Sequence, residues 1–448
     1  MTPRVPRVGA EGAEGAARPG GRKSTQRARL LAGMVATVGR GGYASASVSK
    51  VIIEAGVSRP TFYEYFSDKD DCFLAALSDI HERLMTQVRQ AVAGAPPELA
   101  MRASVAAIVA FASAEPAQAL FLTSQAMGAG PKALDARDAG IAEIGRAIHE
   151  AHSRVPPTSP IPHVDPQIVL GGLYRLLASR LRRGEPGMSR MTDDLSAWLT
   201  SYEQPAGVRS RPSRERTRAR SRRSVRLWPP LPAPARLSYC GRGASKEELA
   251  ANQRERILYA AAQLAEQKGY NATTIADVTR LAGVDGRTFY AAFADKQDAF
   301  MAVHELGVQQ VMSATAGAFF TRDSWPERMW AAGQAFSGFL ESNPMIAHVG
   351  FVEAYAVGPG AVQRVEDSHV TFTIFLQEGY QQRPERPQPS RLTLEAIITS
   401  IFELVYREAR GRKQPHVSGM LGPMAFLALA PFLGADDANR FIEQQLAG

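Results

Sequence analysis

Apolar residues recur every three to four positions through most of the chain, and short polar or glycine-rich stretches interrupt them. This spacing predicts amphipathic helices that each turn one face toward a core. Two clear cases are residues 24–42, expected to start at Ser24 or Thr25, and residues 252–269, expected to start at Asn252. The pattern predicts an all-α fold.

A nineteen-residue string occurs twice in nearly the same form. Residues 55–73 read AGVSRPTFYEYFSDKDDCF, and residues 282–300, which lie 227 positions later, read AGVDGRTFYAAFADKQDAF. An interval this long exceeds the repeat of a solenoid and indicates duplication of a whole domain. The two copies differ mainly just after the shared AGV.

Each copy carries the signals of a helix-turn-helix unit. Gly56 and Gly283 suit the left-handed conformation that ends a short helix tightly. Ser58 and Asp285 suit the N-cap of the helix that follows. A short helix, a glycine turn and a second capped helix together form a helix-turn-helix motif.

The full string resembles the N-terminal DNA-binding domain of the tetracycline-repressor (TetR) family. In the first copy, the matching residues are Gly42-Tyr43, Ala46-Ser47, Ala55-Gly56-Val57, Thr61-Phe62-Tyr63, Phe66, Asp68-Lys69, Asp71 and Phe73. In the second copy, they are Gly269-Tyr270, Thr273-Thr274, Ala282-Gly283-Val284, Thr288-Phe289-Tyr290, Phe293, Asp295-Lys296, Asp298 and Phe300. The resemblance implies an all-α fold of two TetR-like units. Each unit would hold a three-helix DNA-binding domain and a helical ligand-binding and dimerisation domain.

The resemblance also implies which side chains meet DNA in the first copy. A recognition helix points its first residues at base edges in the major groove, while neighbouring groups hold phosphates. The candidates toward bases are Ser58, Arg59, Pro60, Thr61 and Glu64, and those toward phosphates are Thr61, Tyr63, Tyr65 and Lys69. Arg59 suits a bidentate contact with guanine, and Glu64 suits the amino group of cytosine.

The second copy is expected to read DNA less selectively. Its candidates are Arg287 and Thr288 toward bases, and Thr288, Tyr290 and Lys296 toward phosphates. Gly286 and Ala291 stand at the other base-facing positions and offer almost no side chain for readout. Ala292 replaces Tyr65, which removes one expected phosphate contact.

The helical stretches behind each copy are expected to form two bodies. Residues 168–184 with 191–205 resemble the last two helices of the family, which pair between protomers in a four-helix interface, and the second body offers residues 392–413 and 426–446. The alternative for these helices is ordinary core packing. The resemblance also implies a ligand pocket between body helices. Its candidate lining is His348, Phe351, Tyr355, His369 and Phe372, each of which has ordinary core packing as its alternative.

Basic charge is concentrated outside the predicted domains. The chain carries a net charge of +8, but residues 205–243 hold eleven Arg against one Glu, and residues 1–29 hold seven basic residues against two Glu. Proline, glycine and like charge keep such segments from packing a core. The second segment is therefore predicted to be a flexible linker, either a solvated connector or a basic arm that contacts phosphates.

These features give a map of six parts. They are a disordered N-terminal tail at 1–22, a DNA-binding domain at 23–74, a helical ligand and dimerisation domain at 75–204, an Arg- and Pro-rich linker at 205–246, a second DNA-binding domain at 247–301, and a second helical ligand and dimerisation domain at 302–448.

The sequence argues against several other classes of protein. Cys72 and Cys240 have no metal-binding spacing, and so few cysteines favour a reducing cytosol. The longest apolar run, at 424–435, is too short to span a membrane. No metalloprotease, phosphate-loop or nucleophile-elbow motif is present. We therefore expect no enzyme activity, catalytic residue, metal or cofactor, no membrane partner, and a cytoplasmic, nucleoid-associated protein.

The expected function is sequence-specific regulation of transcription at a double-stranded DNA operator. The regulator would be a repressor that an unidentified small molecule releases. The alternative is a non-specific, architectural DNA-binding protein held by its Arg-rich linker. Two assemblies also remain open at this point. The halves pair within one chain as a pseudo-dimer, or whole chains form a homodimer.

Overall fold

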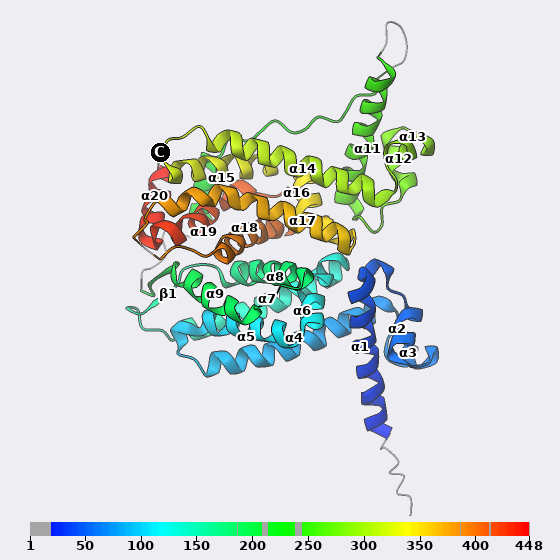
Figure 1. Cartoon of the computed structure of the whole chain (residues 1–448), viewed down its shortest axis with the longest axis horizontal. Coiled ribbons are helices and arrows are strands. Elements are labelled where there is room, and N and C mark those ends of the chain that lie inside the picture. Colours follow the sequence, from blue (N-terminus) through cyan, green and yellow to red (C-terminus); the bar gives the residue numbers. More distant parts are fainter. Residues whose placement is uncertain are drawn as a thin grey trace, which may run out of the picture.

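The computed structural model describes residues 19–185, 187–207, 214–237, 244–385, 387–411 and 414–447. These residues form twenty α-helices, several short 3-10 helices and one pair of short strands, so the predicted all-α fold is confirmed (Figure 1). Most of the predicted tail at 1–22 lies outside the described residues, as does Cys240.

The first half and the linker contain the elements α1 (Pro19–Ser45), α2 (Val48–Ala55), α3 (Arg59–Tyr65), α4 (Lys69–Ala93), η1 (Pro97–Leu99), α5 (Ala100–Ala114), α6 (Pro116–Thr123), η2 (Gln125–Gly128), α7 (Pro131–His152), β1 (Pro160–Pro162), α8 (Pro166–Arg183), η3 (Met188–Arg190), α9 (Met191–Thr200), β2 (Glu203–Pro205) and α10 (Arg214–Ser224). The second half contains α11 (Lys246–Lys268), α12 (Ile275–Ala282), α13 (Gly286–Ala292), α14 (Lys296–Phe319), α15 (Trp325–Ser342), α16 (Pro344–Phe351), η4 (Glu353–Ala356), α17 (Pro359–Thr371), η5 (Phe372–Gln381), α18 (Arg391–Gly411), η6 (Val417–Met420), α19 (Leu421–Leu433) and α20 (Ala435–Ala447). The strands β1 and β2 pair antiparallel.

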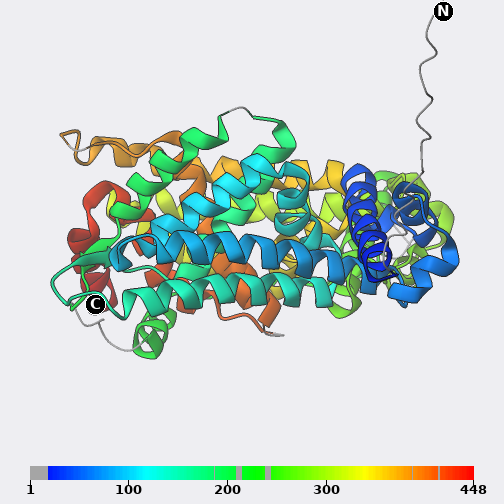
Figure 2. The same ribbon diagram turned by 90° about the horizontal axis from the view of Figure 1, so that it is seen from below.

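Each half consists of a small head followed by a helical body. The heads are α1–α3 and α11–α13, and Figures 1 and 2 both show them at the same end of the molecule. The bodies lie side by side behind the heads, and the long helices α8 and α18 pack against each other where the bodies meet (Figure 1). In the same view, α3 and α13 lie on the outer side of the heads, away from the bodies.

The bodies repeat at an interval of 228 residues. Helices α6 and α16 begin at Pro116 and Pro344, and helices α7 and α17 begin at Pro131 and Pro359. Proline suits these first turns because its missing N–H would have no partner inside the helix. The duplication seen in the heads therefore extends through the bodies.

The first helix of each half begins earlier than the sequence pattern predicts. Helix α1 starts at Pro19 instead of Ser24 or Thr25. Helix α11 starts just after Ser245, whose side chain and that of Glu248 form a capping box. The predicted start at Asn252 is wrong, since a stronger N-terminal signal, the capping box at Ser245, lies seven residues upstream.

The predicted last helices are partly corrected. Residues 168–184 and 392–413 correspond to α8 and α18, whereas residues 191–205 form a helix only as far as Thr200. The predicted helix at 426–446 is two helices, α19 and α20. They are separated at Gly434, whose φ of 90° a continuous right-handed helix does not allow.

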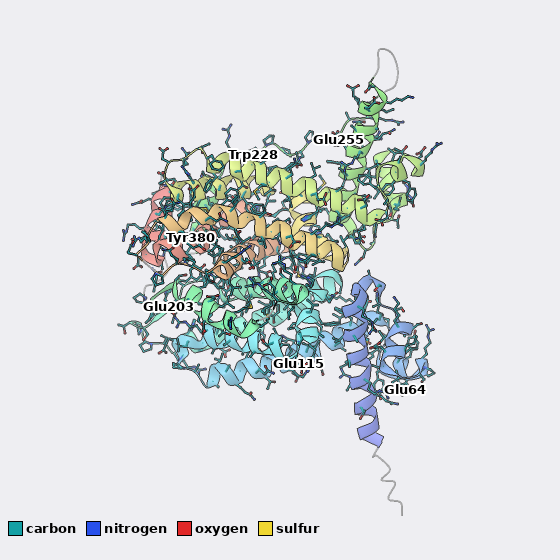
Figure 3. The ribbon with its side chains drawn as sticks, in the orientation of Figure 1. Glu64, Glu115, Glu203, Trp228, Glu255 and Tyr380 are labelled. Carbon is teal, nitrogen blue, oxygen red and sulfur yellow. The ribbon has the colours of Figure 1, made fainter. Side chains whose placement is uncertain are left out.

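The described part of the linker is packed on the second body, contrary to the prediction of a flexible segment. We call residues 225–237 the strap. Val225 is buried, the Trp228 ring lies 6.1 Å from that of Phe339, and Leu231 N–H donates to Asn343 Oδ1 at 2.8 Å. Figure 3 labels Trp228 on the outer side of the second body. Charge counting missed this contact because the apolar strap residues follow the arginine run.

Asn252 fastens the strap at its far end. Its side chain donates to the carbonyl of Ala235 at 2.9 Å and accepts from the N–H of Leu237 at 3.2 Å. The residue predicted to start a helix instead satisfies the backbone of the incoming chain. Such backbone groups need partners when they are packed against a protein surface.

One stretch passes the length and composition test for a membrane span, which the apolar-run analysis did not predict. Residues Pro97–Ala114 have a mean hydropathy of 1.3. Much of this stretch is α5, whose residues Met101, Val105 and Ile108 are buried in the first body. The core helix of a folded body has the same composition.

Candidate nucleic-acid interface

The turn between the second and third helices of each head has the predicted geometry. Gly56 ends α2 with φ 59° and ψ 42°, and Gly283 ends α12 with φ 61° and ψ 41°. Both values lie in the left-handed region, where a side chain is strained. The tight turns set the angle at which α3 and α13 leave the heads.

Two arginines that the sequence analysis missed hold these turns from the first helix of each head. Arg29 donates to the carbonyl of Gly56 at 2.6 Å, and Arg256 donates to the carbonyl of Gly283 at 3.1 Å. The carbonyls belong to the last turns of α2 and α12, which have no partner within the helix. The signal that points to these arginines is their own separation of 227 residues, the same as that of the heads.

The start of α3 presents the predicted base-facing residues to solvent. The Ser58 side chain accepts from Thr61 N–H at 3.2 Å, and its hydroxyl lies 2.8 Å from that of Thr61. This cap confirms the predicted helix start and restrains both hydroxyls. Arg59, Pro60 and Glu64 are exposed, and Figure 3 shows Glu64 on the outer side of the first head.

The start of α13 repeats this frame with fewer side chains. Asp285 accepts from Thr288 N–H at 2.7 Å, and this hydrogen bond lowers the pKa of the Asp285 carboxyl. Arg287 and Ala291 are exposed. A Cβ atom built at Gly286 would meet nothing within 4 Å, so this helix begins with an open surface.

A tyrosine projects from the middle of each predicted recognition helix, α3 and α13, which we call the reader helices. Tyr63 is 50% exposed and Tyr290 is 61% exposed. Behind them lie the fully buried Phe62 and Phe289, with ring centroids 5.4 Å and 5.5 Å from the respective tyrosine rings in edge-on contact. The phenylalanines anchor the helices, and the tyrosine hydroxyls face outward, as a phosphate contact requires.

The other predicted phosphate contacts are less exposed. Tyr65 is half-buried, and its hydroxyl donates to Gln26 Oε1 at 3.4 Å. Lys69 donates to the carbonyl of Tyr43 at 3.3 Å, and Lys296 donates to the carbonyl of Tyr270 at 2.9 Å. Both lysines are therefore already hydrogen-bonded within the protein. Lys69 and Lys296 are the first residues of α4 and α14, and each contacts the chain near the end of the first helix of its half.

Differences between the heads also appear away from the reader helices. The Tyr43 hydroxyl donates to Asp70, and burial together with this carboxylate raises the pKa of Tyr43 above its usual range. In the second head, burial raises the pKa of Tyr270 to about 12, and its backbone N–H donates to Glu353 Oε2 at 2.6 Å. Glu353 lies at the start of η4, so the second head is tied directly to its body.

Two small cavities adjoin each other in the second body. Their volumes are about 30 and 70 Å³, and Phe372 and Phe402 line both of them. Of the predicted pocket residues, Phe351, His369 and Phe372 line the smaller cavity. A drug-sized ligand needs a cavity of about 300 Å³ or more. Neither of these two cavities reaches that size, whereas a third hollow of the second body, about 530 Å³ and lined by residues of 370–380 and 391–395, exceeds it.

Two predicted pocket residues have other contacts. His348 Nε2 lies 3.4 Å from a carboxylate oxygen of Glu353, and the Tyr355 hydroxyl accepts from Arg175 of the first half at 2.7 Å. Neither residue lines either of the two cavities. Aromatic spacing alone could not separate a cavity wall from a contact between bodies.

Within the described ranges, no group of three or more His, Cys, Asp or Glu residues is placed to hold a metal ion. Cys72 is buried near the start of α4, and burial raises the pKa of its thiol to about 12. A thiol with this pKa stays protonated at neutral pH and is a poor nucleophile.

Comparison with known proteins supports the assignment of the heads. The family model described as bacterial regulatory proteins, tetR family, matches residues 30–76 and again residues 257–303. The HTH-type transcriptional activator FasR of Mycolicibacterium smegmatis is 26% identical over 157 residues, which cover 35% of this chain and 60% of that protein. The chain thus matches about three fifths of the length of this curated relative.

Two regulators of solved structure match part of this chain. The fatty acid degradation regulator FadR from Bacillus halodurans has 17% sequence identity and a TM-score of 0.36, over 39% of this chain and 94% of that one. A regulatory protein of the tetR family from Rhodococcus RHA1 has 21% identity and a TM-score of 0.32, over 46% of this chain and 97% of that one.

Proposed function

From the premise that this chain is a tandem member of the TetR family, with two matched DNA-binding domains, we propose that it is a sequence-specific regulator of transcription with two unlike readers. The proposed readers are the heads at 23–74 and 247–301, which bind a double-stranded DNA operator. A regulator of this kind acts in the cytoplasm, on the nucleoid.

One observation carries the proposal. The two heads keep the same turn, the same capped start and the same outward tyrosine, while their side chains differ where a recognition helix meets bases. Arg59 and Glu64 in α3 offer hydrogen-bonding groups, whereas Gly286 and Ala291 in α13 do not. A common scaffold with different readout residues fits two unlike half-sites in one asymmetric operator.

The pairing of the bodies supports a pseudo-dimer. Both heads lie at one end of the molecule, and behind them α8 and α18 hold the two bodies together within one chain (Figure 1). The family arrangement that normally takes two chains is then made by one. Light scattering tests this point: we expect a mass near 48.5 kDa, and twice that value would indicate a homodimer.

We further propose that a small molecule controls DNA binding through the second body. The two adjoining cavities are mostly apolar in lining and too small for a ligand in this structure. A ligand would have to enlarge them, and the tie between Glu353 and the second head offers a route for that change. We propose repression released by this ligand, and a reporter gene tests the direction.

The placement of α10 favours sequence-specific binding over the architectural alternative. Arg218 forms an ion pair with Glu408, and Arg222 Nε lies 3.4 Å from a carboxylate oxygen of Glu341. Both acidic residues belong to the second body. Helix α10 packs on α19 and η6, which lie toward the end of the bodies opposite the heads (Figures 1 and 2). The arginines of α10 that are held there therefore add no basic charge to the end of the molecule that carries the heads.

Selection of bound sequences from a random DNA pool tests the function most directly. We expect enrichment of a site with two unequal half-sites, the more strongly defined one belonging to the first head. Failure to enrich any sequence, with equal affinity for all members of the pool, would favour the architectural alternative. Enrichment of a perfect palindrome would instead contradict the unlike readers.

A further inference from the structure

The contact between the bodies has pseudo-two-fold symmetry. Arg182 in α8 pairs with Glu366 in α17, and Arg410 in α18 pairs with Asp138 in α7. Arg410 lies 228 positions after Arg182, and Glu366 lies 228 positions after Asp138, which is the interval of the bodies. The second ion pair is therefore the symmetry mate of the first. This reciprocity is the hallmark of an isologous, dimer-like interface.

Residues at corresponding positions meet each other near the pseudo-two-fold axis. Gly172 and Ser400 are 228 residues apart, and a Cβ atom added to Gly172 would lie only 2.7 Å from the Cα of Ser400. The absence of a side chain at Gly172 thus lets the backbones of α8 and α18 come close. A residue pair one turn further along these helices lies equally near the axis.

That next pair breaks the symmetry in charge. Arg175 and Glu403 are again 228 residues apart, and Arg175 Nε lies 3.1 Å from Glu403 Oε2. Only 4% of the Arg175 side chain and none of the Glu403 side chain is exposed. One position of the repeat thus holds a buried cation in the first half and a buried anion in the second.

The surroundings reinforce this difference. Arg137 of α7, whose side chain is also fully buried, donates to Glu403 at 3.1 Å, and Arg407 of α18 donates to it at 3.2 Å. The residue that corresponds to Arg137 in the second half is the apolar Val365. Glu403 is thus the shared acceptor for both buried arginines of the first half.

Two further ion pairs across the interface have the same polarity. Arg180 lies 2.9 Å from Glu395, and Arg183 lies 2.9 Å from Asp367. The residue corresponding to Arg180 is Glu408, which the linker residue Arg218 neutralises. The first half mainly contributes cations to the interface, and the second half mainly contributes anions.

We infer that the Arg175–Glu403 position makes the two dimerisation faces selective for each other. Two first halves in the same arrangement would place Arg175 against Arg175, and the Arg137 side chains would lose Glu403 and keep only Asp138 of their own half, 2.8 Å away. Two second halves would place Glu403 against Glu403. Each carboxylate would then keep only Arg407 of its own helix. Burying like charges side by side with too few partners is strongly unfavourable, whereas the unlike pair is satisfied. The proper partner of each half is therefore the other half.

This inference concerns pairing and stands apart from the proposed function in DNA binding. It also explains why both halves are joined in one chain: neither half can pair with a second copy of itself, so each needs the other. If the chain proves not to bind DNA, the selectivity of the two faces is still open to test, because the test measures only which halves associate.

The test uses the whole chain with a protease site inserted after Gly207, cut after folding. Cut proteins with and without heavy isotopes are mixed, and native mass spectrometry counts the fragment pairs. The comparison protein carries Arg137→Met, Arg175→Met and Glu403→Met, since buried ion clusters tolerate apolar replacement. For the unmodified chain, we expect unlike pairs to exceed like pairs by at least about 100-fold. For the apolar variant, we expect the share of like pairs to rise at least about tenfold. Equal shares in the two proteins, whether high or low, would overturn the inference.

A single substitution covers the case in which the apolar variant does not fold. Glu403→Gln in the cut chain removes the carboxylate from Arg175 and leaves Arg137 with Asp138 alone, so the dissociation constant of the unlike pair should rise at least about 100-fold. The matched control is Glu378→Gln, which removes the partner of Arg328 within the second half. An equal effect of the two substitutions would refute a special role for Glu403.

Discussion

The ammonium group of Lys69 lies 3.9 Å from the centroid of the Tyr43 ring. The second head repeats this contact, with 4.0 Å between Lys296 and the ring of Tyr270. In both heads the lysine also donates to the carbonyl of the same tyrosine. A cation over an aromatic face stabilises the fold modestly, by about 0.5–1 kcal/mol at such partly exposed sites. Each lysine is therefore oriented by its own head before DNA arrives.

We predict that Lys69→Met weakens DNA binding equally for all sequences. A phosphate contact releases bound counterions, so its loss should lower the slope of log affinity against log salt by about 1. A slope that stays constant would mean that Lys69 serves only to hold Tyr43. Lys296→Met in the second head is the matched variant, and binding titrations between low and high salt measure both.

We predict that Tyr63→Phe also weakens DNA binding by the same amount for all sequences. The ring keeps its edge-on contact with Phe62, so the head should remain folded. Loss of one hydrogen bond to a charged phosphate should cost about 1.5–3 kcal/mol of binding free energy, without changing base preference. Tyr290→Phe is the corresponding change in the second head. A shift in the selected sequence would show that Tyr63 reads bases.

Arg59→Ala should relax one position of the operator. A bidentate arginine contact with guanine discriminates by about 1–3 kcal/mol, and its loss should leave the other positions unchanged. Arg287→Ala is the control, since it should act on the other half-site. Selection from a random pool with each variant measures the base preference. An unchanged preference at every position would exclude Arg59 from base readout.

Local signals made the reader helices predictable. The caps Ser58–Thr61 and Asp285–Thr288 and the left-handed Gly56 and Gly283 depend on residues within four positions of one another. Such short-range chemistry is legible in a single sequence. The exposure of the base-facing residues then follows from the amphipathic pattern of a short helix on a buried phenylalanine.

Contacts between distant segments were not predictable. The hydrogen bond from Arg175 to Tyr355 joins residues 180 positions apart, and the bond from Leu231 to Asn343 joins residues 112 apart. No periodicity encodes which distant face a buried arginine or a strap will meet. The linker was predicted to be flexible because its charge outweighed the few apolar residues that dock it.

Gly56→Ala should loosen the first reader. The φ of 59° costs a residue with a side chain about 1–2 kcal/mol, and the new Cβ atom would also lie 2.6 Å from Arg29. The free energy of local opening, measured by hydrogen exchange of the α3 amides, should fall by about that amount. Gly286→Ala is the matched control. Its Cβ atom enters open space, so protection in α13 should be unchanged or slightly higher.

The stability of the second body should depend on two buried histidines. Burial lowers the pKa of His304 to about 4, with a smaller effect from Arg364, and burial also holds the pKa of His369 well below its usual value. In the unfolded chain, both imidazoles would bind protons near pH 6.5. The unfolded state then binds more protons than the folded state as the pH falls from about 6.5 to about 4. The free energy of unfolding should therefore decrease across this window and level off above it.

His304→Phe should remove one of these protons from the balance. The slope of the unfolding free energy against pH, measured by urea unfolding, should fall by about 1.4 kcal/mol per pH unit within that window. Ser368→Ala is the control, because the Ser368 hydroxyl lies 3.5 Å from His304 but does not titrate, so the slope should persist. If His304→Phe leaves the slope unchanged, the imidazole must already be able to take up a proton in the folded body. The cavity beside it would then be open to water in solution, since only solvation or an anion could support that charge.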